Sequence, residues 1–379
     1  MKDIQKLPSE KGRAWLEVDL NALAHNAAAL SSALPEKCSL MAVVKADAYG
    51  HGAVAAARRL WSEGVRSYAV ATIFEAVELR KNGLDGEILV LGYTHPDDAV
   101  FLSEFCLTQL IVDGAHAALL NGTGYKVRVH IAVDTGMHRL GIESTNLDEI
   151  ESVFKCGNLS VEGTATHLAS SDSLIPEDIE FTKLQIKRFS SAVEALKGKG
   201  HDTGKLHIQA SYGIFNYPGL ECDYARAGIA LYGVLSHGDA VRTKLDLKPV
   251  LALRALVAQV RRIDAGEAVS YGRTFTAGAP MNIATVSVGY ADGVPRQMSG
   301  NGGHCIVRGH KAAIIGRVCM DLLMIDASGI DAVTPGDIAT IIGTDGSESI
   351  RCEDVAAASG TITNDILCRL GSRLPRIYI

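Results

Sequence analysis

The stretch "SLMAVVKADAYGHG" (residues 39–52) begins as a short apolar run, ends that run on Lys45, and then turns through a tyrosine and two glycines. Seven similar runs follow it, most of them separated by stretches with helical spacing and glycine stops. The eight runs cover residues 39–45, 67–72, 87–92, 108–113, 127–135, 163–168, 205–210 and 224–233. Because strands that alternate with helices pair in parallel, eight such units predict a closed (β/α)8 barrel.

A doubly wound open sheet is the alternative fold for the same alternation. It is disfavoured because no G-x-G-x-x-G follows the first strand. From about residue 240 the pattern changes to strand-like runs separated by Gly, Asp and Pro turns, with little helix before residues 350–371. We therefore predict an α/β chain with a TIM-like (β/α)8 barrel over residues 1–240 and a mostly β domain over residues 241–379.

Composition limits the possible partners and surroundings of the chain. A net charge of −6 argues against nucleic acid or an anionic membrane as the main partner. The eight cysteines are scattered without metal-ligand spacing, as expected of reduced core residues in a cytosolic protein without a metal site. Residues 1–13 contain no apolar signal-peptide core, and no apolar run approaches the roughly 18 residues that span a bilayer. We expect a soluble, cytoplasmic protein.

Chemistry in such a barrel is expected where the strands end, on one rim. Reactive side chains stand at or near these predicted ends: Lys45, Asp134, Thr135, His167, Ser211 and Arg226. The alternative is that these polar residues merely cap the strands. That interpretation accounts for each residue taken alone, but it accounts less well for all six occurring together. A lysine here more often extends its stem to water, but partial burial would lower its pKa and favour Schiff-base chemistry.

Six ordered motifs resemble those of the alanine racemases, and the resemblance runs from residue 13 to residue 378. They are "VVKADAYGHG" (43–52), "DTGMHRLG" (134–141), "THLASSD" (166–172), "VSYGRTFTA" (269–277), "VSVGYADGVPR" (286–296) and "GRVCMD" (316–321). This resemblance implies a pyridoxal 5'-phosphate enzyme with an N-terminal barrel and a C-terminal β domain. It also implies a homodimer with shared active sites that acts on a small amino acid.

The resemblance assigns the cofactor contacts residue by residue. Lys45 is the Schiff-base lysine, while Tyr49, Ser211 and the backbone at Gly228 and Ile229 hold the phosphate. The loops after strands seven and eight are the usual phosphate site of this barrel, which agrees with that assignment.

Arg226 is placed against the pyridine nitrogen, where many other pyridoxal-phosphate enzymes have a carboxylate. A guanidinium stays protonated and has no acceptor, so it donates to an unprotonated ring nitrogen. The ring is then a weaker electron sink, which should suppress transamination while leaving proton exchange at Cα available. Arg139 is implied to contact the phenolic oxygen of the cofactor and the carboxylate of the substrate.

Racemisation needs an acid/base group on each side of Cα. The resemblance implies that Lys45 serves one face and that Tyr271, delivered by the partner subunit, serves the other. Tyrosine is mostly protonated near neutrality, so its pKa must be lowered. His167 would link Tyr271 to Arg226 by hydrogen bonds. The residues expected to line the substrate side are Arg139, Tyr290, Met320 and Asp321.

Two positions depart from the family pattern. Ala132 stands where many members have a carbamylated lysine that holds the arginine, so Arg139 must be held by another anion or held less firmly. Ser372 stands where a phosphate-contacting tyrosine is often found, which would enlarge the pocket. These departures predict serine racemisation beside alanine racemisation.

The leading hypothesis is racemisation of L-alanine to D-alanine, with a serine or broad-specificity racemase as the alternative in the same class. A basic-amino-acid decarboxylase can share this architecture, but it uses a carboxylate at the ring nitrogen and is disfavoured by Arg226. A non-catalytic protein that manages cofactor supply resembles the barrel alone, so the second domain with Tyr271 argues against it.

Overall fold

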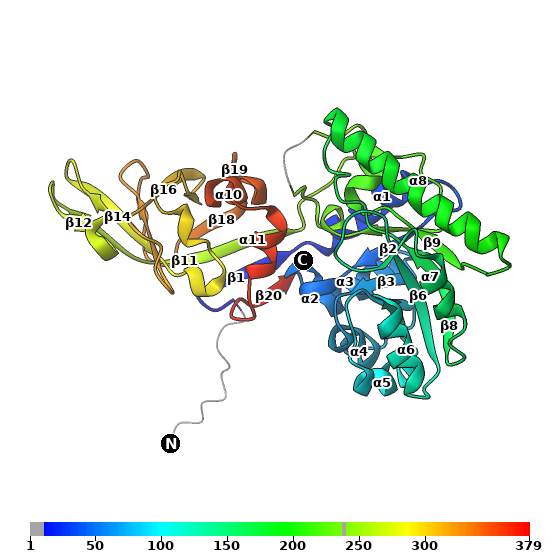
Figure 1. The fold of residues 1–379 in the computed structure, drawn as a ribbon. Helices are drawn as coiled ribbons and strands as arrows, with labels where there is room; N and C mark the ends of the chain where they lie inside the picture. Colours follow the sequence, from blue (N-terminus) through cyan, green and yellow to red (C-terminus); the bar gives the residue numbers. More distant parts are fainter. Residues whose placement is uncertain (1–10, 237–239) are drawn as a thin grey trace, which may run out of the picture.

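The computed structural model of the protein describes residues 11–236 and 240–379. The first ten residues of the N-terminal stretch considered above therefore lie outside the described residues. Within this range the chain forms two bodies side by side, a helix-covered parallel sheet and a mostly β body (Figure 1).

The parallel sheet is a nearly closed barrel, as predicted. Its strands follow the order β10-β2-β3-β4-β5-β6-β8-β9. They are β2 (Ser39–Val43), β3 (Ser67–Val70), β4 (Glu87–Val90), β5 (Thr108–Ile111), β6 (Val127–Asp134), β8 (Leu159–Ala165), β9 (Lys205–His207) and β10 (Tyr224–Ala227). Between β9 and β10 the closure is a single parallel bridge, which joins Ala210 to Arg226. The short β7 (Ile142–Glu143) pairs with the end of β6.

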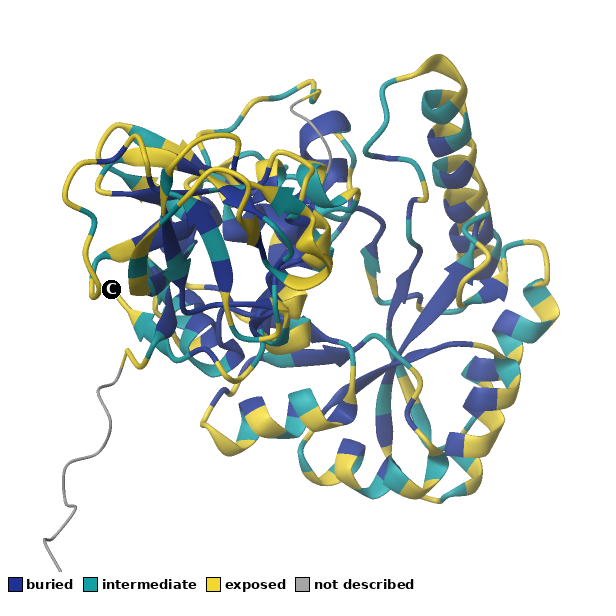
Figure 2. Cartoon of the chain, turned by 90° about the vertical axis from the view of Figure 1, so that its left-hand side faces the viewer, coloured by how far each residue is buried: buried dark blue, intermediate teal, exposed yellow. Residues whose placement is uncertain are grey.

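Helices surround this barrel; most of them bury one face, whereas the short α9 (Ser211–Asn216) is buried at every residue. Figure 2 shows buried strands at the centre and exposed residues on the outer faces of the helices. The helices are α1 (Leu20–Ser32), α3 (Ala53–Ser62), α4 (Ile73–Lys81), α5 (Ala99–Glu104), α6 (Gly114–Gly122), α7 (Leu147–Phe154), α8 (Pro176–Gly198) and α9 (Ser211–Asn216). Side-chain caps fix several starts: Asp19 caps α1, and Thr72 with Glu75 forms a capping box on α4.

The second body is built around one long antiparallel strand, β11 (Leu251–Ile263), which pairs with β1 (Ala14–Val18), β14 (Met281–Val286) and β18 (Ile338–Asp345). The other elements of this body are β12 (Ala268–Val269), β13 (Phe275–Thr276), β15 (His304–Val307), β16 (His310–Ile315), β17 (Leu323–Asp326), β19 (Glu348–Ile350), β20 (Arg376–Tyr378), α10 (Cys352–Ser359) and α11 (Thr363–Arg369). Since β1 and β20 also pair, both ends of the described chain lie in this sheet. The boundary at residue 240 stays a prediction.

Lys45 begins α2 (Lys45–Tyr49), a single turn with an unusual backbone. Its residues 46–49 all have φ near +52° to +53°, so they form a left-handed turn without a glycine. Such a conformation costs about 1–2 kcal/mol per residue. Neighbouring contacts hold the turn: the amide of Ala46 donates to Glu75 at 2.6 Å, and Asp47 pairs with Arg376 of β20 at 3.2 Å. The second body therefore helps to hold the lysine turn.

None of the helices in the described ranges combines the length and apolar character needed to cross a bilayer. The cysteines are all free, but only half of them are core residues: Cys38, Cys222, Cys305 and Cys352 are buried, whereas Cys106 and Cys368 are exposed. The expectation of eight core cysteines is therefore wrong for the exposed ones.

The strained turn leads to a prediction about stability. Ala46 is exposed and left-handed, so Ala46→Gly should raise the free energy of unfolding by about 0.5–1 kcal/mol, because relief of strain exceeds the entropy added to the unfolded chain. Ala28, exposed in the middle of α1, is the matched control, and Ala28→Gly should lower stability by a similar amount. Denaturant titration measures both, and equal losses would show that the turn is unstrained.

Candidate active site

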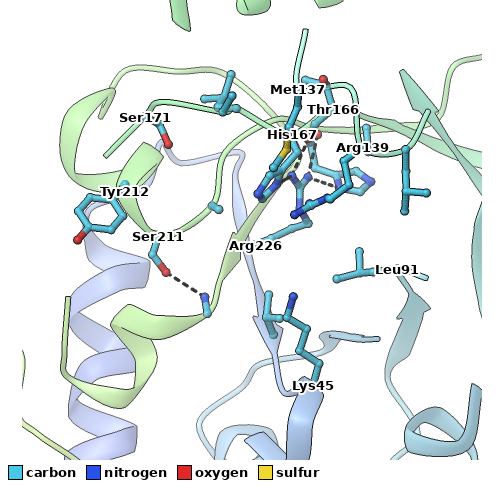
Figure 3. Close-up of a pocket in the computed structure, with 18 of the residues that line it drawn as sticks. Lys45, Leu91, Met137, Arg139, Thr166, His167, Ser171, Ser211, Tyr212 and Arg226 are labelled. Carbon is cyan, nitrogen blue, oxygen red and sulfur yellow. Dashed lines mark hydrogen bonds between the residues drawn. The ribbon is translucent and has the colours of Figure 1, made fainter. Parts of the chain in front are cut away.

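The residues expected to contact the cofactor converge on one cavity of about 620 Å³ at the carboxyl ends of the barrel strands (Figure 3). A volume of this size is typical of cofactor and small-molecule sites. The cavity is lined by all eight of these residues: Lys45, Tyr49, Arg139, His167, Ser211, Arg226, Gly228 and Ile229.

Lys45 reaches the cavity from the turn after β2, and Figure 3 shows its amine directed toward Arg226 and Arg139. Burial lowers the pKa of Lys45 below its ordinary value, and the positive charges of Arg139 and Arg226 lower it further. Both effects favour the neutral amine, which is the nucleophilic form. The half-buried lysine predicted from the sequence is therefore present.

Arg226 is buried, and its guanidinium contacts three backbone carbonyls and the rings of His167 and His207. Its guanidinium donates to the carbonyls of Thr166 at 2.7 Å, His207 at 2.9 Å and Ile208 at 3.1 Å. Burial lowers the pKa of Arg226 to about 10, so the group remains a cation at neutral pH. Among the described residues, no carboxylate forms an ion pair with it.

His167 lines the cavity next to Arg226. Its Nδ1 is 3.2 Å from the guanidinium of Arg226, and because arginine only donates, this nitrogen is an acceptor. Burial, followed by the charges of Arg226, Arg139 and Lys45, lowers the pKa of His167 to about 3. The neutral ring therefore carries its proton on Nε2.

Hydroxyl and backbone N–H groups gather at one end of the cavity. The hydroxyl of Ser211 accepts from the amides of Gly228 at 3.0 Å and Ala230 at 3.3 Å. A Cβ atom at Gly228 would lie 2.7 Å from the hydroxyl of Tyr49, so only glycine fits there. The space left by Gly228 and the cluster of hydroxyl and backbone N–H groups around it suit a phosphate.

The loop that carries Arg139 is shaped by the side chain of Asp134. Its carboxylate accepts from the amides of Gly136 at 2.9 Å and His138 at 3.0 Å. The guanidinium of Arg139 itself forms no hydrogen bond to protein within the described ranges, and Ala132 beside it in the cavity offers no acceptor.

The four residues expected from the second body do not line this cavity: Tyr271, Tyr290, Met320 and Asp321. Tyr271 is 69% exposed and follows β12, which lies at the end of the molecule remote from the barrel (Figure 1). Met320 and Tyr290 are likewise exposed, and Asp321 pairs with Arg373 at 2.6 Å. A single chain therefore does not bring the expected second base to Lys45.

Ser372 is exposed and does not line the cavity, so the expectation that it enlarges the pocket is not supported within one chain. Two polar residues that the sequence reading missed, Ser236 and Asn364, do line it, and the Ser236 hydroxyl donates to Asn364 Oδ1 at 2.5 Å. No short motif marks either of them.

Gln185 was also missed. It is buried on α8 and donates to the hydroxyl of Thr135 and the carbonyl of His167, both at 3.1 Å. Gln185 therefore connects the loop that carries Arg139 to the segment after β8 that carries His167. A polar residue on the buried face of an amphipathic helix is the signal that identifies it.

Comparison with known proteins places these residues in a family. The profile of the alanine racemase N-terminal domain matches residues 18–236, and that of the C-terminal domain matches residues 250–378. An alanine racemase of Carboxydothermus hydrogenoformans is 38% identical over 96% of this chain and 99% of its own length. An alanine racemase of Bacillus anthracis, solved with bound L-Ala-P, superposes with a TM-score of 0.89 at 32% identity, covering 97% of this chain and 95% of that one.

An amino-acid racemase of Enterococcus faecalis is 42% identical over 97% of this chain, which spans about half (52%) of that relative's length. The matches of both domains, over nearly all of the sequence, show that the chain belongs to the alanine racemase family.

Proposed function

We propose that the protein is a pyridoxal-phosphate-dependent racemase of a small amino acid, with L-alanine as its first substrate. The observation that carries this proposal is the convergence of eight family-matching residues on one cavity, with the amine of Lys45 facing two arginines. Its family membership and the names of its relatives support the same reaction class.

The residues present fit this cofactor. The gap at Gly228, which a single Cβ would fill against Tyr49, together with the Ser211 hydroxyl, suits the phosphate. Lys45 would hold the aldehyde carbon, and the guanidinium of Arg226 would face the ring nitrogen. When bound, pyridoxal phosphate delocalises the negative charge that develops at Cα of an attached amino acid.

The protein's own residues account for the proton steps on one face. The neutral amine of Lys45, favoured by burial and by the nearby cations, accepts the proton from Cα. His167, kept neutral by burial, can offer the proton on its Nε2 to a hydroxyl beyond it, while its Nδ1 is held by Arg226. Arg139, which has no partner in the protein within the described ranges, is available to an anionic group such as a substrate carboxylate.

The opposite face requires a second base, and we assign it to Tyr271 of a partner subunit. Within one chain Tyr271 is 69% exposed on a projecting ribbon far from Lys45. A two-fold dimer could place this ribbon over the partner's cavity, because an isologous contact uses the same surface twice.

The direct test incubates the purified protein with single L-amino acids, with and without pyridoxal phosphate. We expect cofactor-dependent loss of optical rotation with L-alanine. Release of carbon dioxide without racemisation would instead support the decarboxylase hypothesis, and no turnover of any amino acid would support a non-catalytic role.

Lys45 is predicted to be the residue that holds the cofactor covalently. Borohydride reduction of the loaded protein should attach the cofactor to the peptide containing Lys45, and Lys45→Ala should abolish this label and lower kcat/KM by at least about a hundredfold. Lys37→Ala, at an exposed lysine, is the control and should keep both the label on the Lys45 peptide and the parental kcat/KM. A label on any other lysine of the parent protein would refute the assignment.

The shared site predicts complementation between inactive variants. Lys45→Ala and Tyr271→Phe, each inactive alone, should recover about a quarter of parental activity when mixed equally, because half of the dimers would be mixed and each would have one complete site. The matched control mixes either protein with the Lys45→Ala, Tyr271→Phe double variant. Because the double variant supplies neither group, no dimer in these mixtures has a complete site, and no activity should be recovered. Confirmed subunit exchange without recovered activity would contradict a shared site.

Serine is a second candidate substrate, favoured by the polar pair that lines the cavity. Ser236 and Asn364 present a hydroxyl and an amide to it. A site that can hydrogen-bond a substrate hydroxyl favours the substrate that has one.

This pair predicts which residue sets selectivity. Asn364→Leu keeps the branched shape of the side chain and removes the amide, so the ratio of kcat/KM for serine to that for alanine should fall about tenfold, the value of one hydrogen bond. Ser372→Ala, at an exposed residue outside the cavity, should leave the ratio unchanged. A change with Ser372→Ala and none with Asn364→Leu would reverse the assignment.

A further inference from the structure

A buried chain of side chains leads from Arg226 down through the barrel. The guanidinium of Arg226 lies 2.7 Å from Nδ1 of His207, and Nε2 of His207 lies 2.9 Å from Nδ1 of His130. Nε2 of His130 then lies 3.4 Å from a carboxylate oxygen of Glu87, at the start of β4. We call Glu87, His130, His207 and Arg226 the buried chain.

The direction of every proton in the buried chain follows from Arg226. Arginine has donors only, so Nδ1 of His207 is an acceptor and a neutral His207 carries its proton on Nε2. That proton points to Nδ1 of His130, so a neutral His130 also carries its proton on Nε2, toward Glu87. Burial, with the charge of Arg226 next, lowers the pKa of His130 to about 4 and that of His207 well below its ordinary value, which keeps both rings neutral.

Burial raises the pKa of Glu87 above its ordinary value, whereas the hydrogen bond from Tyr224 and the charge of Arg128 offset part of this effect, so Glu87 can end the buried chain as an ionised acceptor. Its Oε1 is buried without a hydrogen-bond partner among the described residues and lies 3.4 Å from Nε2 of His130, so it is the acceptor within reach of that N–H. Its Oε2 accepts from the hydroxyl of Tyr224 at 2.8 Å. A carboxylate can accept from both donors, whereas a protonated carboxyl group would have to donate from one oxygen. Glu87 is thus separated from the Arg226 cation by two imidazoles.

The packing of His130 supports a specific placement of its ring. A Cβ atom at Gly163 on β8 would lie 2.8 Å from three atoms of this ring, so the ring occupies the space that any other residue at position 163 would fill. Gly163 has no left-handed backbone to explain its identity. The glycine therefore leaves room for the imidazole.

We propose that Glu87 is a positioning residue that acts on Arg226 through His130 and His207. It provides the acceptor for the N–H at Nε2 of His130. The two histidines are then fixed in orientation, and they hold the guanidinium of Arg226 in place without a direct contact between Glu87 and Arg226. The consequence for racemisation rests on the proposed function, whereas the proton positions do not.

The proton positions can be tested by ¹⁵N NMR of histidine side chains in the full-length protein, with and without pyridoxal phosphate. We expect His130 and His207 to be neutral and protonated only on Nε2, with slowly exchanging N–H protons. Glu87→Leu removes the acceptor and should abolish slow exchange at His130, whereas Glu87→Gln keeps an acceptor oxygen and should retain it. A proton on Nδ1 of either ring in the parent would overturn the proposal.

Racemisation kinetics provide the second measurement. Glu87→Leu and Gly163→Ala should each lower kcat about tenfold to a hundredfold, as is typical when a partner that orients a functional imidazole is lost. Glu87→Gln should restore most of it. Gly157→Ala is the matched control, because nothing lies within 4 Å of its added Cβ. Parental kcat and unchanged N–H signals in Glu87→Leu would refute the role of Glu87, while an inactive parent with the expected signals would refute only the proposed function.

Discussion

The site and the closure of the barrel both depend on the hydrogen bonds made by Arg226, a buried cation. The backbone amide of Arg226 donates to the carbonyl of Gln209. In the described part of the chain, this contact belongs to the isolated parallel bridge between Ala210 and Arg226 that joins the ends of β9 and β10. The guanidinium of Arg226 donates to carbonyls at the ends of β8 and β9, those of Thr166, His207 and Ile208. Removing a guanidinium from water is costly unless its donors are bonded. The same contacts that satisfy this cation therefore join the last strands of the barrel and fix one wall of the cavity.

Much of the barrel was predictable because its signals are local. Each strand is a short apolar run, and most are followed by a helix with its own start and stop signals, so eight strands could be recognised in order. The pairing of β1 with β11 could not be recognised in this way. These strands are separated by the whole barrel in sequence, and a five-residue apolar segment does not indicate which sheet it joins.

The candidate site shows the same division. Residues at strand ends, such as Lys45 and His167, could be inferred because parallel strands bring their carboxyl ends to one rim. Ser236 and Asn364 could not, since they come from loops and from α11, whose positions depend on how the two bodies pack. The role of Ser372 stays a prediction: its place in the chain is close to a family motif, but within one chain its side chain is exposed and does not line the cavity.

Charge balance explains why this cavity suits an anionic cofactor. Lys45, Arg139 and Arg226 face one space, and their mutual repulsion, after burial itself, lowers the pKa of the lysine. His167 and His207 remain neutral for the same reasons, so they add hydrogen bonds without adding charge. An anion in the cavity would relieve this repulsion, and the cations would stabilise it in turn. The positive groups around this buried space thus have two effects. They favour the neutral amine of Lys45, and they attract a phosphate.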